Sequence, residues 1–373
     1  MSDGDDGSHG NRRRRPSAAK GDRRSDPGGT RPRAGRPDGP PATRLKDIAE
    51  LAGVSLQTVS HVMNNNGSVS EEVRARIREI GDRMGYRPNR SAKAMRTGRS
   101  QTLGLVISDL GNPFYAEFAR SVERAAAAAR YAVLLVDAQA SSAGKAAAGE
   151  VAERMAELMS HPVDGVISTV RYPAVVKLDI PVVFLGNPVR GRDSVTSDDV
   201  RGGRALAEHL LALGHRRFGL VTSPLPGGIP IRRGALIERL RGEARIVWEY
   251  RTPPTESVAP QVAALLQRRD VTIIVCSNDI VAISVQRALR DLGIGVPDDV
   301  SVAGYDDIPW AAIVTPALTT MKLPLAEMGR ATVRFILDRL QDPARRSRRL
   351  SLPVTLVERE SVARARSRPP HPD

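Results

Sequence analysis

The stretch that most constrains this chain is residues 44–95, which read RLKDIAELAGVSLQTVSHVMNNNGSVSEEVRARIREIGDRMGYRPNRSAKAM. Apolar residues recur at helical spacing over 45–52, which predicts a first short helix. Gly53 ends that helix, since glycine accepts the left-handed conformation of a tight turn. Ser55 then fits the N-cap of a second helix at about 56–64, because its hydroxyl can accept a bond from an unpaired amide.

The predicted second helix has two different faces. Val59, Val62 and Met63 fall on the side that packs inward, while Gln57, Thr58 and His61 fall on the side that can hydrogen-bond base edges. Two short helices joined by a glycine-containing turn predict a helix-turn-helix. A plain three-helix bundle is the alternative. The residues expected to contact DNA here are Ser55, Leu56, Gln57, Thr58, Ser60, His61 and Asn64.

The residues that follow decide between a helix-turn-helix and a plain three-helix bundle. A third helix is expected after Ser70 and ends near Met84, where Gly85-Tyr86-Arg87-Pro88 breaks it. Here the sequence resembles the lactose-repressor (LacI/GalR) family of bacterial transcription factors. The matching segments are KDIAELAGVS, TVSHVMN, VSEE, GYRPN and RTGRSQTLGLV, in the family's order and spacing. The resemblance implies a DNA-binding headpiece at 44–87, followed by a hinge helix and linker at 88–100.

The resemblance also implies a role for the hinge. In the family this short helix enters the minor groove and inserts a leucine into a base step, and Met95 stands at that place here. Methionine is also used as an apolar wedge, although Met95 packing against the core is the alternative. Isolated helices shorter than about 12–15 residues are marginal in water, so we expect the hinge to fold only when dimer and DNA hold it. Its expected DNA contacts are Arg90, Lys93 and Met95.

Positive charge is densest around this headpiece. The 373-residue chain has a net charge of +14. Residues 44–100 hold 11 Lys and Arg against 6 Asp and Glu, whereas residues 101–358 hold 31 against 28. Such an imbalance suits contact with DNA phosphates. Residues 1–43 hold almost nothing apolar and are expected to be a disordered basic tail, and residues 363–373 a second disordered tail.

From Thr102 onward, short apolar runs alternate with helical segments. Apolar runs such as TLGLVISD, AVLLVDA and TIIVCS are typical of buried strands. This rhythm predicts parallel sheets covered by helices on both faces. It restarts after Asp198-Asp199, so we expect two similar α/β halves. Helices are expected at about 115–130, 145–159, 200–213, 232–241, 257–268, 279–292 and 325–340.

Two such halves resemble the periplasmic-binding-protein-like core of the same family. The matching segments are GNPFYAE, DDVRGG, LGHRRFGLV, CSNDIVAI, GVPDDVSVAGYDDIP and TPALTT. The expected fold is therefore an all-α helix-turn-helix headpiece plus an α/β core of two periplasmic-binding-protein-like subdomains with parallel sheets. The core spans 101–362 and serves effector binding and dimerisation. Its N-subdomain is expected at about 101–196 and 323–351, and its C-subdomain at about 197–320 and 354–362.

Sequence signatures of catalysis are missing. No G-x-G-x-x-G follows a strand, and there is no phosphate-binding P-loop, H-E-x-x-H or cysteine pair. The six histidines do not cluster at metal-ligand spacing, and His215 is interpreted as a loop histidine. Cys276 lies in an apolar run and is interpreted as a core residue. We therefore expect no enzyme activity, cofactor or metal site.

The chain also lacks signs of a membrane protein. Nothing approaches 18 consecutive apolar residues, and the N-terminus lacks an apolar signal-peptide core. We therefore expect a cytoplasmic, nucleoid-associated protein with no membrane partner.

An effector cleft is expected where the strands end. Ligands of open α/β sheets bind outside the carboxyl ends of the strands. The resemblance implies that Phe114, Tyr115 and Asp306 line this cleft through an aromatic face and a carboxylate, and Asp109 stands at a comparable strand end. For Phe114 the alternative is core packing. Asp279 is interpreted as a helix N-cap rather than a ligand contact.

One part of the expected cleft departs from the family. The segment 223–248 is short, and Ile231 stands where the family has an arginine. Either Arg232 or Arg233 can substitute, and the sequence leaves the choice open. Aromatic residues make up only 3% of the chain, so surfaces for stacking a sugar are few. The effector stays open between a sugar, a phosphosugar and a nucleobase, or there is none.

These observations predict a sequence-specific transcriptional regulator of repressor type. It is expected to bind a palindromic double-stranded operator as a homodimer, with a small-molecule effector in the core adjusting the affinity. Two alternatives remain: a DNA-binding factor whose core ignores ligands, and a solute-binding protein.

Overall fold

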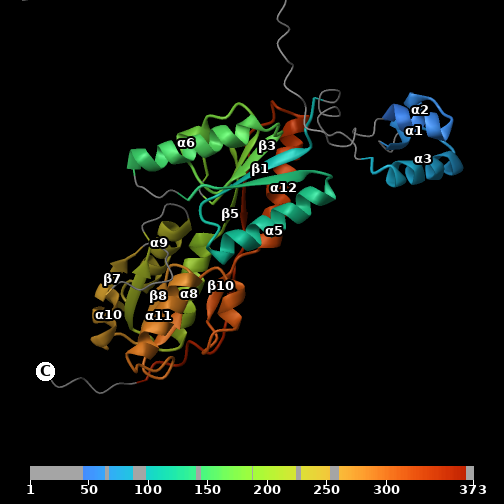
Figure 1. Ribbon diagram of the computed structural model, residues 1–373. Coiled ribbons are helices and arrows are strands. Elements are labelled where there is room, and N and C mark those ends of the chain that lie inside the picture. The colour runs from blue at the N-terminus through green and yellow to red at the C-terminus, as the bar shows by residue number, and fades with distance from the viewer. Residues whose placement is uncertain are drawn as a thin grey trace, which may run out of the picture. The chain divides into compact units, whose positions relative to one another are not determined.

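The computed structural model describes residues 45–63, 67–86, 98–139, 144–186, 188–223, 228–252 and 260–366. The chain divides into two compact units, Met1–Pro88 and Asn89–Asp373 (Figure 1). Several residues singled out from the sequence lie outside the described ones: the tail at 1–43, Asn64, Arg90, Lys93 and Met95.

The first unit contains three helices: α1 (Leu45–Ala52), α2 (Leu56–Met63) and α3 (Glu71–Arg83). Their core is built on Ile48, Val59 and Ile77, none of which has exposed surface. Gly53 has a φ of +64° in the turn between α1 and α2, a conformation that glycine adopts without steric cost. This arrangement is the expected helix-turn-helix with a third supporting helix.

The second unit begins with a six-stranded parallel sheet, whose strands follow the order β11-β5-β4-β3-β1-β2. We call this sheet and its helices the N-subdomain. The strands are β1 (Thr102–Ile107), β2 (Ala132–Asp137), β3 (Gly165–Ser168), β4 (Val182–Leu185), β5 (Asp193–Ser197) and β11 (Arg349–Leu352). The helices are α5 (Pro113–Ala128), α6 (Gly144–Ser160), α7 (Pro173–Val176) and α12 (Leu325–Gln341).

The two faces of this sheet are covered by different helices. Figure 1 shows α5 and α12 on one face and α6 on the other. The burial of β1 follows this division, because Leu105 and Ile107 belong to the apolar cluster of α5 and α12, whereas Val106 belongs to that of α6. Side chains alternate along a strand, so a continuous apolar run is what a sheet buried on both faces requires.

The C-subdomain holds a four-stranded parallel sheet in the order β7-β6-β8-β9. Its strands are β6 (Arg217–Thr222), β7 (Arg245–Arg251), β8 (Ile273–Cys276) and β9 (Ser301–Ala303). The surrounding helices are α8 (Asp199–Ala212), α9 (Gly228–Leu240), α10 (Pro260–Gln267), α11 (Asp279–Asp291) and the 3₁₀ helix η1 (Pro309–Ala312). An antiparallel pair, β10 (Thr320–Lys322) and β12 (Thr355–Val357), completes it.

The chain crosses between the two subdomains three times. The crossings follow β5, β10 and β11, and lead into α8, α12 and β12 respectively. One apolar cluster runs through both subdomains, from Phe118 of α5 to Leu236 of α9. The expected fold class, a helix-turn-helix headpiece with a two-part parallel α/β core, is confirmed.

Some local expectations need correction. Helix α9 begins at Gly228, four residues before the expected start, and Pro230 fits its first turn because a prolyl φ is already helical. Residues 363–366, expected in a disordered tail, are held against the C-subdomain. Ala363 donates its N–H to Ser301 Oγ at 3.2 Å, and Ala365 donates to the Leu213 carbonyl at 2.9 Å.

Candidate functional site

Ser55 caps helix α2. Its Oγ accepts a hydrogen bond from the Thr58 N–H at 3.0 Å and lies 2.9 Å from the Thr58 hydroxyl oxygen. The bond satisfies one of the amides that a helix start leaves unpaired. The expected cap is therefore confirmed, and it fixes the Thr58 side chain at the start of the helix.

The outward face of α2 carries the side chains expected to read DNA. Val59 and Val62 are buried in the headpiece core, whereas Gln57 is exposed. Leu56 is 52% exposed, and an apolar side chain at such a place can contact a thymine methyl group. Ser60 is half-buried on the same helix.

The neighbouring loop positions His61. Its ring is half-buried against Gly67, where an added Cβ would lie only 2.7 Å from Nδ1. The φ of Gly67 is +78°, so both the backbone and the contact favour glycine. Gly81 of α3 lies against the tip of the Met63 side chain of α2. An added Cβ there would fall 2.5 Å from Met63 Cε, so the methionine would have to shift.

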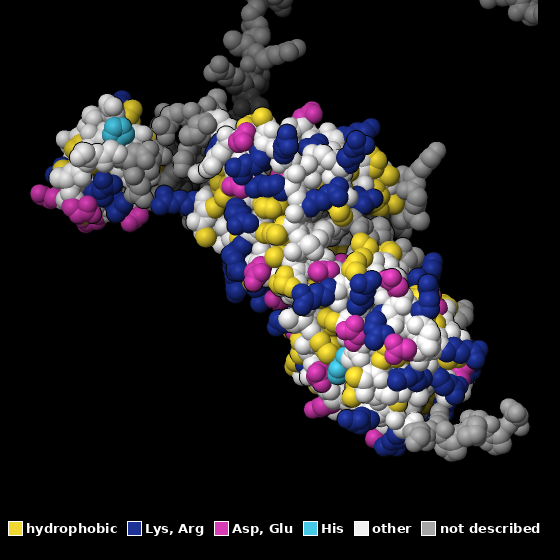
Figure 2. Space-filling model, turned by 180° about the vertical axis from the view of Figure 1, so that it is seen from behind, with side chains coloured by type: hydrophobic (Ala, Val, Ile, Leu, Met, Phe, Trp, Pro, Cys, Tyr) yellow, Lys and Arg dark blue, Asp and Glu magenta, His cyan; other side chains and the backbone are white. Residues whose placement is uncertain are grey.

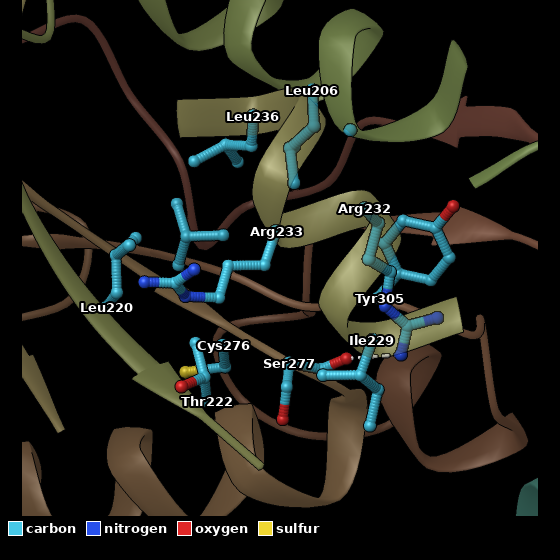
Figure 3. A pocket seen from close by; sticks show the side chains of 12 residues that line it. Leu206, Leu220, Thr222, Ile229, Arg232, Arg233, Leu236, Cys276, Ser277 and Tyr305 are labelled. Carbon is cyan, nitrogen blue, oxygen red and sulfur yellow. Dashed lines mark hydrogen bonds between the residues drawn. The ribbon is translucent and has the colours of Figure 1, made fainter. Parts of the chain in front are cut away.

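In the core, a polar cluster surrounds Arg232 of α9. The guanidinium carbon lies 3.9 Å from the centroid of the Tyr305 ring. Nη1 is 3.6 Å from Asp199 Oδ1 and 3.7 Å from Asp306 Oδ1. Nη2 donates to the Ser277 carbonyl, the contact drawn as a dashed line in Figure 3. The charge is thus held by two buried carboxylates and an aromatic face.

The members of this cluster come from four elements that converge. Ser277 follows β8, and Tyr305 and Asp306 follow β9, so these residues stand at the carboxyl ends of parallel strands. Asp199 begins α8 and Arg232 lies in the second turn of α9. This is the position where ligands of open α/β sheets bind.

Several buried polar atoms of the cluster have no hydrogen-bond partner among the described residues. They are Asp199 Oδ1, Arg232 Nε, Ser277 Oγ and the Tyr305 hydroxyl. Leaving such an atom unpaired costs about 1–3 kcal/mol. A concentration of unpaired atoms therefore indicates a place that water or a polar ligand completes.

Asp306 is the carboxylate singled out from the sequence, and it lies inside this cluster. It is 7% exposed and has a φ of +123°. Burial raises its pKa well above the ordinary value, and Asp279 and Asp199 add to the rise, while Arg232 opposes it. Asp306 is thus a buried carboxyl group held in a strained backbone conformation, of the kind found at functional sites.

Asp279 has a structural role that differs from the expected one. The N-cap of α11 is Asn278, whose side chain accepts from the Val281 N–H at 2.9 Å. Asp279 is fully buried and accepts from the Ile308 N–H at 2.9 Å and from the Thr320 hydroxyl at 2.5 Å. Burial nevertheless raises its pKa to about 6. The interpretation of Asp279 as an N-cap was wrong by one residue.

The aromatic residues expected in the cleft lie at the start of α5. The rings of Phe114 and Tyr115 meet edge to face, 4.9 Å apart. Phe114 packs against the apolar clusters of both subdomains, so the packing alternative holds for part of its surface. Burial raises the pKa of Tyr115, and the charges of Asp306 and Asp109 add to the rise. Asp109 accepts from the Gly111 N–H at 2.8 Å.

The structure distinguishes the two arginines that the sequence left open. Arg233 turns away from Tyr305 (Figure 3) and pairs with Glu249 of β7, with Nε 2.7 Å from Oε1. This pairing lowers the pKa of Glu249, despite an opposing effect of burial. Arg232 alone of the two reaches Asp306. Three further residues of the cluster were not predicted, although each lies in a segment that resembles the family: Tyr305 in GYDD, Asp199 in DDVRGG and Ser277 in CSNDIVAI.

A small cavity lies beneath Arg232, between α8, α9 and the ends of β6 and β8 (Figure 3). Its walls are mostly apolar, formed by residues such as Leu206, Leu220 and Leu236. It measures about 30 Å³, room for about two water molecules. Arg232 is one of its lining residues, and its guanidinium donates to the carbonyl of Ser277, another lining residue.

Other candidate chemistries find no support in the part of the chain that the structure describes. No group of three or more His, Cys, Asp or Glu is placed to hold a metal ion. None of the described helices is long and apolar enough to cross a membrane. His215 lies in the loop between α8 and β6, as expected, and is buried there, with ring nitrogens 3.0 Å from the Thr272 hydroxyl and from the Ala363 carbonyl.

A helix-turn-helix unit joined to a two-part α/β core with a buried polar cluster at its strand ends is typical of a DNA-binding transcriptional regulator. Family models agree with this class: "Bacterial regulatory proteins, lacI family" matches residues 44–89, and "Periplasmic binding protein-like domain" matches residues 207–362. The ribose operon repressor of Haemophilus influenzae is 30% identical over 331 residues, covering 85% of this chain and 98% of that protein.

Solved structures show the same likeness. A Lac repressor dimer bound to operator and an anti-inducer matches with a TM-score of 0.74 and 26% identity, over 86% of this chain and 99% of the other. A regulator from Enterococcus faecium with bound ribose matches with a TM-score of 0.64 and 28% identity, over 71% and 100% of the two chains. The chain belongs to the lacI family of bacterial transcriptional regulators.

Proposed function

We propose that this regulator binds a two-fold symmetric operator as a homodimer, each headpiece placing α2 in a major groove. The observation that carries this proposal is the capped helix α2, whose buried Val59 and Val62 leave Gln57 facing outward. A Gln amide can bond adenine in a bidentate way. The proposed DNA contacts are Ser55, Leu56, Gln57, Thr58, Ser60, His61, Asn64, Arg90, Lys93 and Met95. The Lac repressor dimer on its operator supports this assembly by analogy.

The core cleft binds a neutral, polyhydroxylated small molecule. Its unpaired atoms include acceptors and donors, and both kinds suit hydroxyl groups. Among the described residues, Arg232 is the cation that reaches the cluster, and Asp199 and Asp306 flank it, so a phosphate would add negative charge beside two carboxyl groups. A nucleobase would need an aromatic face, and Arg232 covers that of Tyr305. The ribose bound by the Enterococcus faecium protein belongs to the favoured chemical class.

Four residues identified from the sequence serve this site in different ways. Asp306 forms hydrogen bonds with hydroxyl groups of the ligand, and Phe114 and Tyr115 offer the ligand an aromatic edge. Asp109 stands at the neighbouring strand end of the N-subdomain. No arrangement of these groups suggests bond-breaking chemistry, so we assign the site to binding and not to catalysis. A regulator of this kind works on the chromosome, in the cytoplasm.

A core that ignores ligands is the second candidate. It is favoured by one observation, the small size of the cavity that Arg232 lines, about 30 Å³. Thermal shift of the full chain against neutral sugars, and against the same sugars carrying a phosphate, separates the two. A ligand at 100 times its Kd stabilises by about 2.7 kcal/mol, which raises the Tm by several degrees. We expect a rise with a neutral sugar only. A Tm that does not change with any sugar of the panel would favour a core that binds no ligand.

A further inference from the structure

The turn between α12 and β11 is unusually basic. Residues 338–349 read DRLQDPARRSRR and hold five arginines against two aspartates. We call residues 343–349 the basic turn. Figure 2 shows dark-blue Lys and Arg side chains outnumbering magenta Asp and Glu over much of the N-subdomain face in view.

The basic turn is held in place by hydrogen bonds and an ion pair. Arg339 of α12 reaches into it and donates to the carbonyls of Pro343, at 3.4 Å, and Arg346, at 3.3 Å. The same guanidinium pairs with Asp193, which is 1% exposed, at 3.0 Å. Asp193 also accepts from the Arg348 N–H at 2.6 Å. A buried ion pair therefore holds the backbone of the turn in one shape.

The arginines of the turn divide into two groups. Arg345 and Arg348 are used internally, because both pair with Asp338 of α12. Arg346 and Arg349 are exposed and form no ion pair with any described residue. Two cations are thus presented to solvent on a fixed backbone, which reduces the cost of ordering the loop when it contacts a phosphate.

The turn lies where the linker from the headpiece enters the core. Arg99 Nη2 donates to the Leu340 carbonyl at 2.9 Å, and the Ser100 and Gln101 N–H groups donate to Asp164 at 2.7 and 3.0 Å. The eleven residues 87–97 separate this entry point from the described headpiece. Even fully extended they span only about 40 Å. DNA held by the headpiece is therefore within reach of this end of the core.

We propose that Arg346 and Arg349 contact phosphates of the DNA that flanks the operator. The inference rests on the proposed DNA binding and adds a second contact, made by the core itself. DNA is favoured over an acidic protein because the tethered headpiece holds DNA close to the turn at high effective concentration. The alternative is that Arg349 only protects the exposed edge strand β11 from pairing, and this predicts no effect on DNA.

The test compares an R346A/R349A double variant with the wild type on two duplexes. One duplex ends at the operator, and the other extends about 15 base pairs beyond each side. Each lost phosphate contact reduces the slope of log K against log salt by about 0.9. We expect the slope on the long duplex to fall by up to about 2 per subunit, with affinity about three- to tenfold weaker. On the short duplex we expect no change.

The matched control is R241A/R245A, which removes the same charge from two exposed arginines of the C-subdomain. It should behave as the wild type on both duplexes. An R346A/R349A variant that matches this control on the long duplex would overturn the proposal. The basic turn would then either bind an acidic protein or protect the edge strand β11 from pairing. A wild type without specific binding to either duplex would overturn the proposed function as well.

Discussion

The guanidinium carbon of Arg232 lies 3.9 Å from the centroid of the Tyr305 ring. A cation over a desolvated aromatic face gains about 2 kcal/mol, and here Asp199 and Asp306 flank the same cation. Arg232 is therefore held in place before any ligand arrives. A preorganised donor of this kind loses little entropy on binding, which suits a sensor that must respond to a small molecule.

Replacing Arg232 by Ala should weaken effector binding. Ligand hydroxyls would lose a charged donor worth about 1.5–3 kcal/mol, so the effector Kd should rise about tenfold to a hundredfold. Calorimetric titration of the full chain measures this change. The neighbour gives a matched control: R233A removes the pair with Glu249, lowering stability slightly, and should leave the Kd nearly unchanged. An equal rise of the effector Kd in both variants would contradict the role of Arg232 in binding the effector.

Asp306→Asn should separate effector binding from DNA binding. Asparagine has the same size and shape as aspartate, so the substitution makes no new steric demand on the backbone at φ +123° while the carboxyl group is lost. We expect the effector-induced change in operator affinity to disappear, and the affinity without effector to stay within about twofold. Operator titration with and without ligand checks both. A fully responsive D306N protein would remove Asp306 from the site.

His215 should make the core sensitive to acid. Burial lowers its pKa to about 4, opposed in part by the bond to the Ala363 carbonyl. Between about pH 6.5 and 4 the unfolded chain binds a proton that the folded chain does not, so stability falls as the pH falls. The full effect is about 3 kcal/mol. The Tm of H215Q should depend less on pH than that of the wild type across this window. Parallel curves would show that His215 is not buried as described.

The hinge residue Met95 lies outside the described residues, and its role as a wedge stays a prediction. If methionine unstacks a base step, Met95→Ala should reduce operator affinity and DNA bending together. The headpiece should stay folded, since its core is built on Ile48, Val59 and Ile77. Gel phasing measures the bend. Unchanged bending would leave Met95 as a packing residue.

The sequence predicted those parts of the molecule that local chemistry determines. The cap at Ser55 and the turn at Gly53 depend on neighbours within a few residues, and the α/β rhythm depends on short apolar runs. The choice between Arg232 and Arg233 was different. Adjacent helical residues point about 100° apart, so the choice depends on where α9 begins and how it packs.

Hydrogen bonds between residues far apart in the chain could not be predicted from the sequence either. Asp279 bonds to Ile308 and Thr320, and His215 bonds to Ala363, so their roles depend on segments far along the chain. A polar residue at a strand end or in a loop gives no sign of such a partner. Asp279 was therefore assigned too local a role, whereas the loop position of His215 was predicted and its partners were not.

The central claim is that α2 reads a two-fold symmetric DNA sequence. Selection of binding sites from a randomised duplex pool by the purified full chain tests it most directly, with Gln57→Ala run in parallel. A good base contact discriminates by about 1–3 kcal/mol. We predict a palindromic motif for the wild type, and for the variant the same motif with preference lost at one position in each half-site. A pool that shows no enriched sequence, or an enriched sequence without symmetry, would contradict the account.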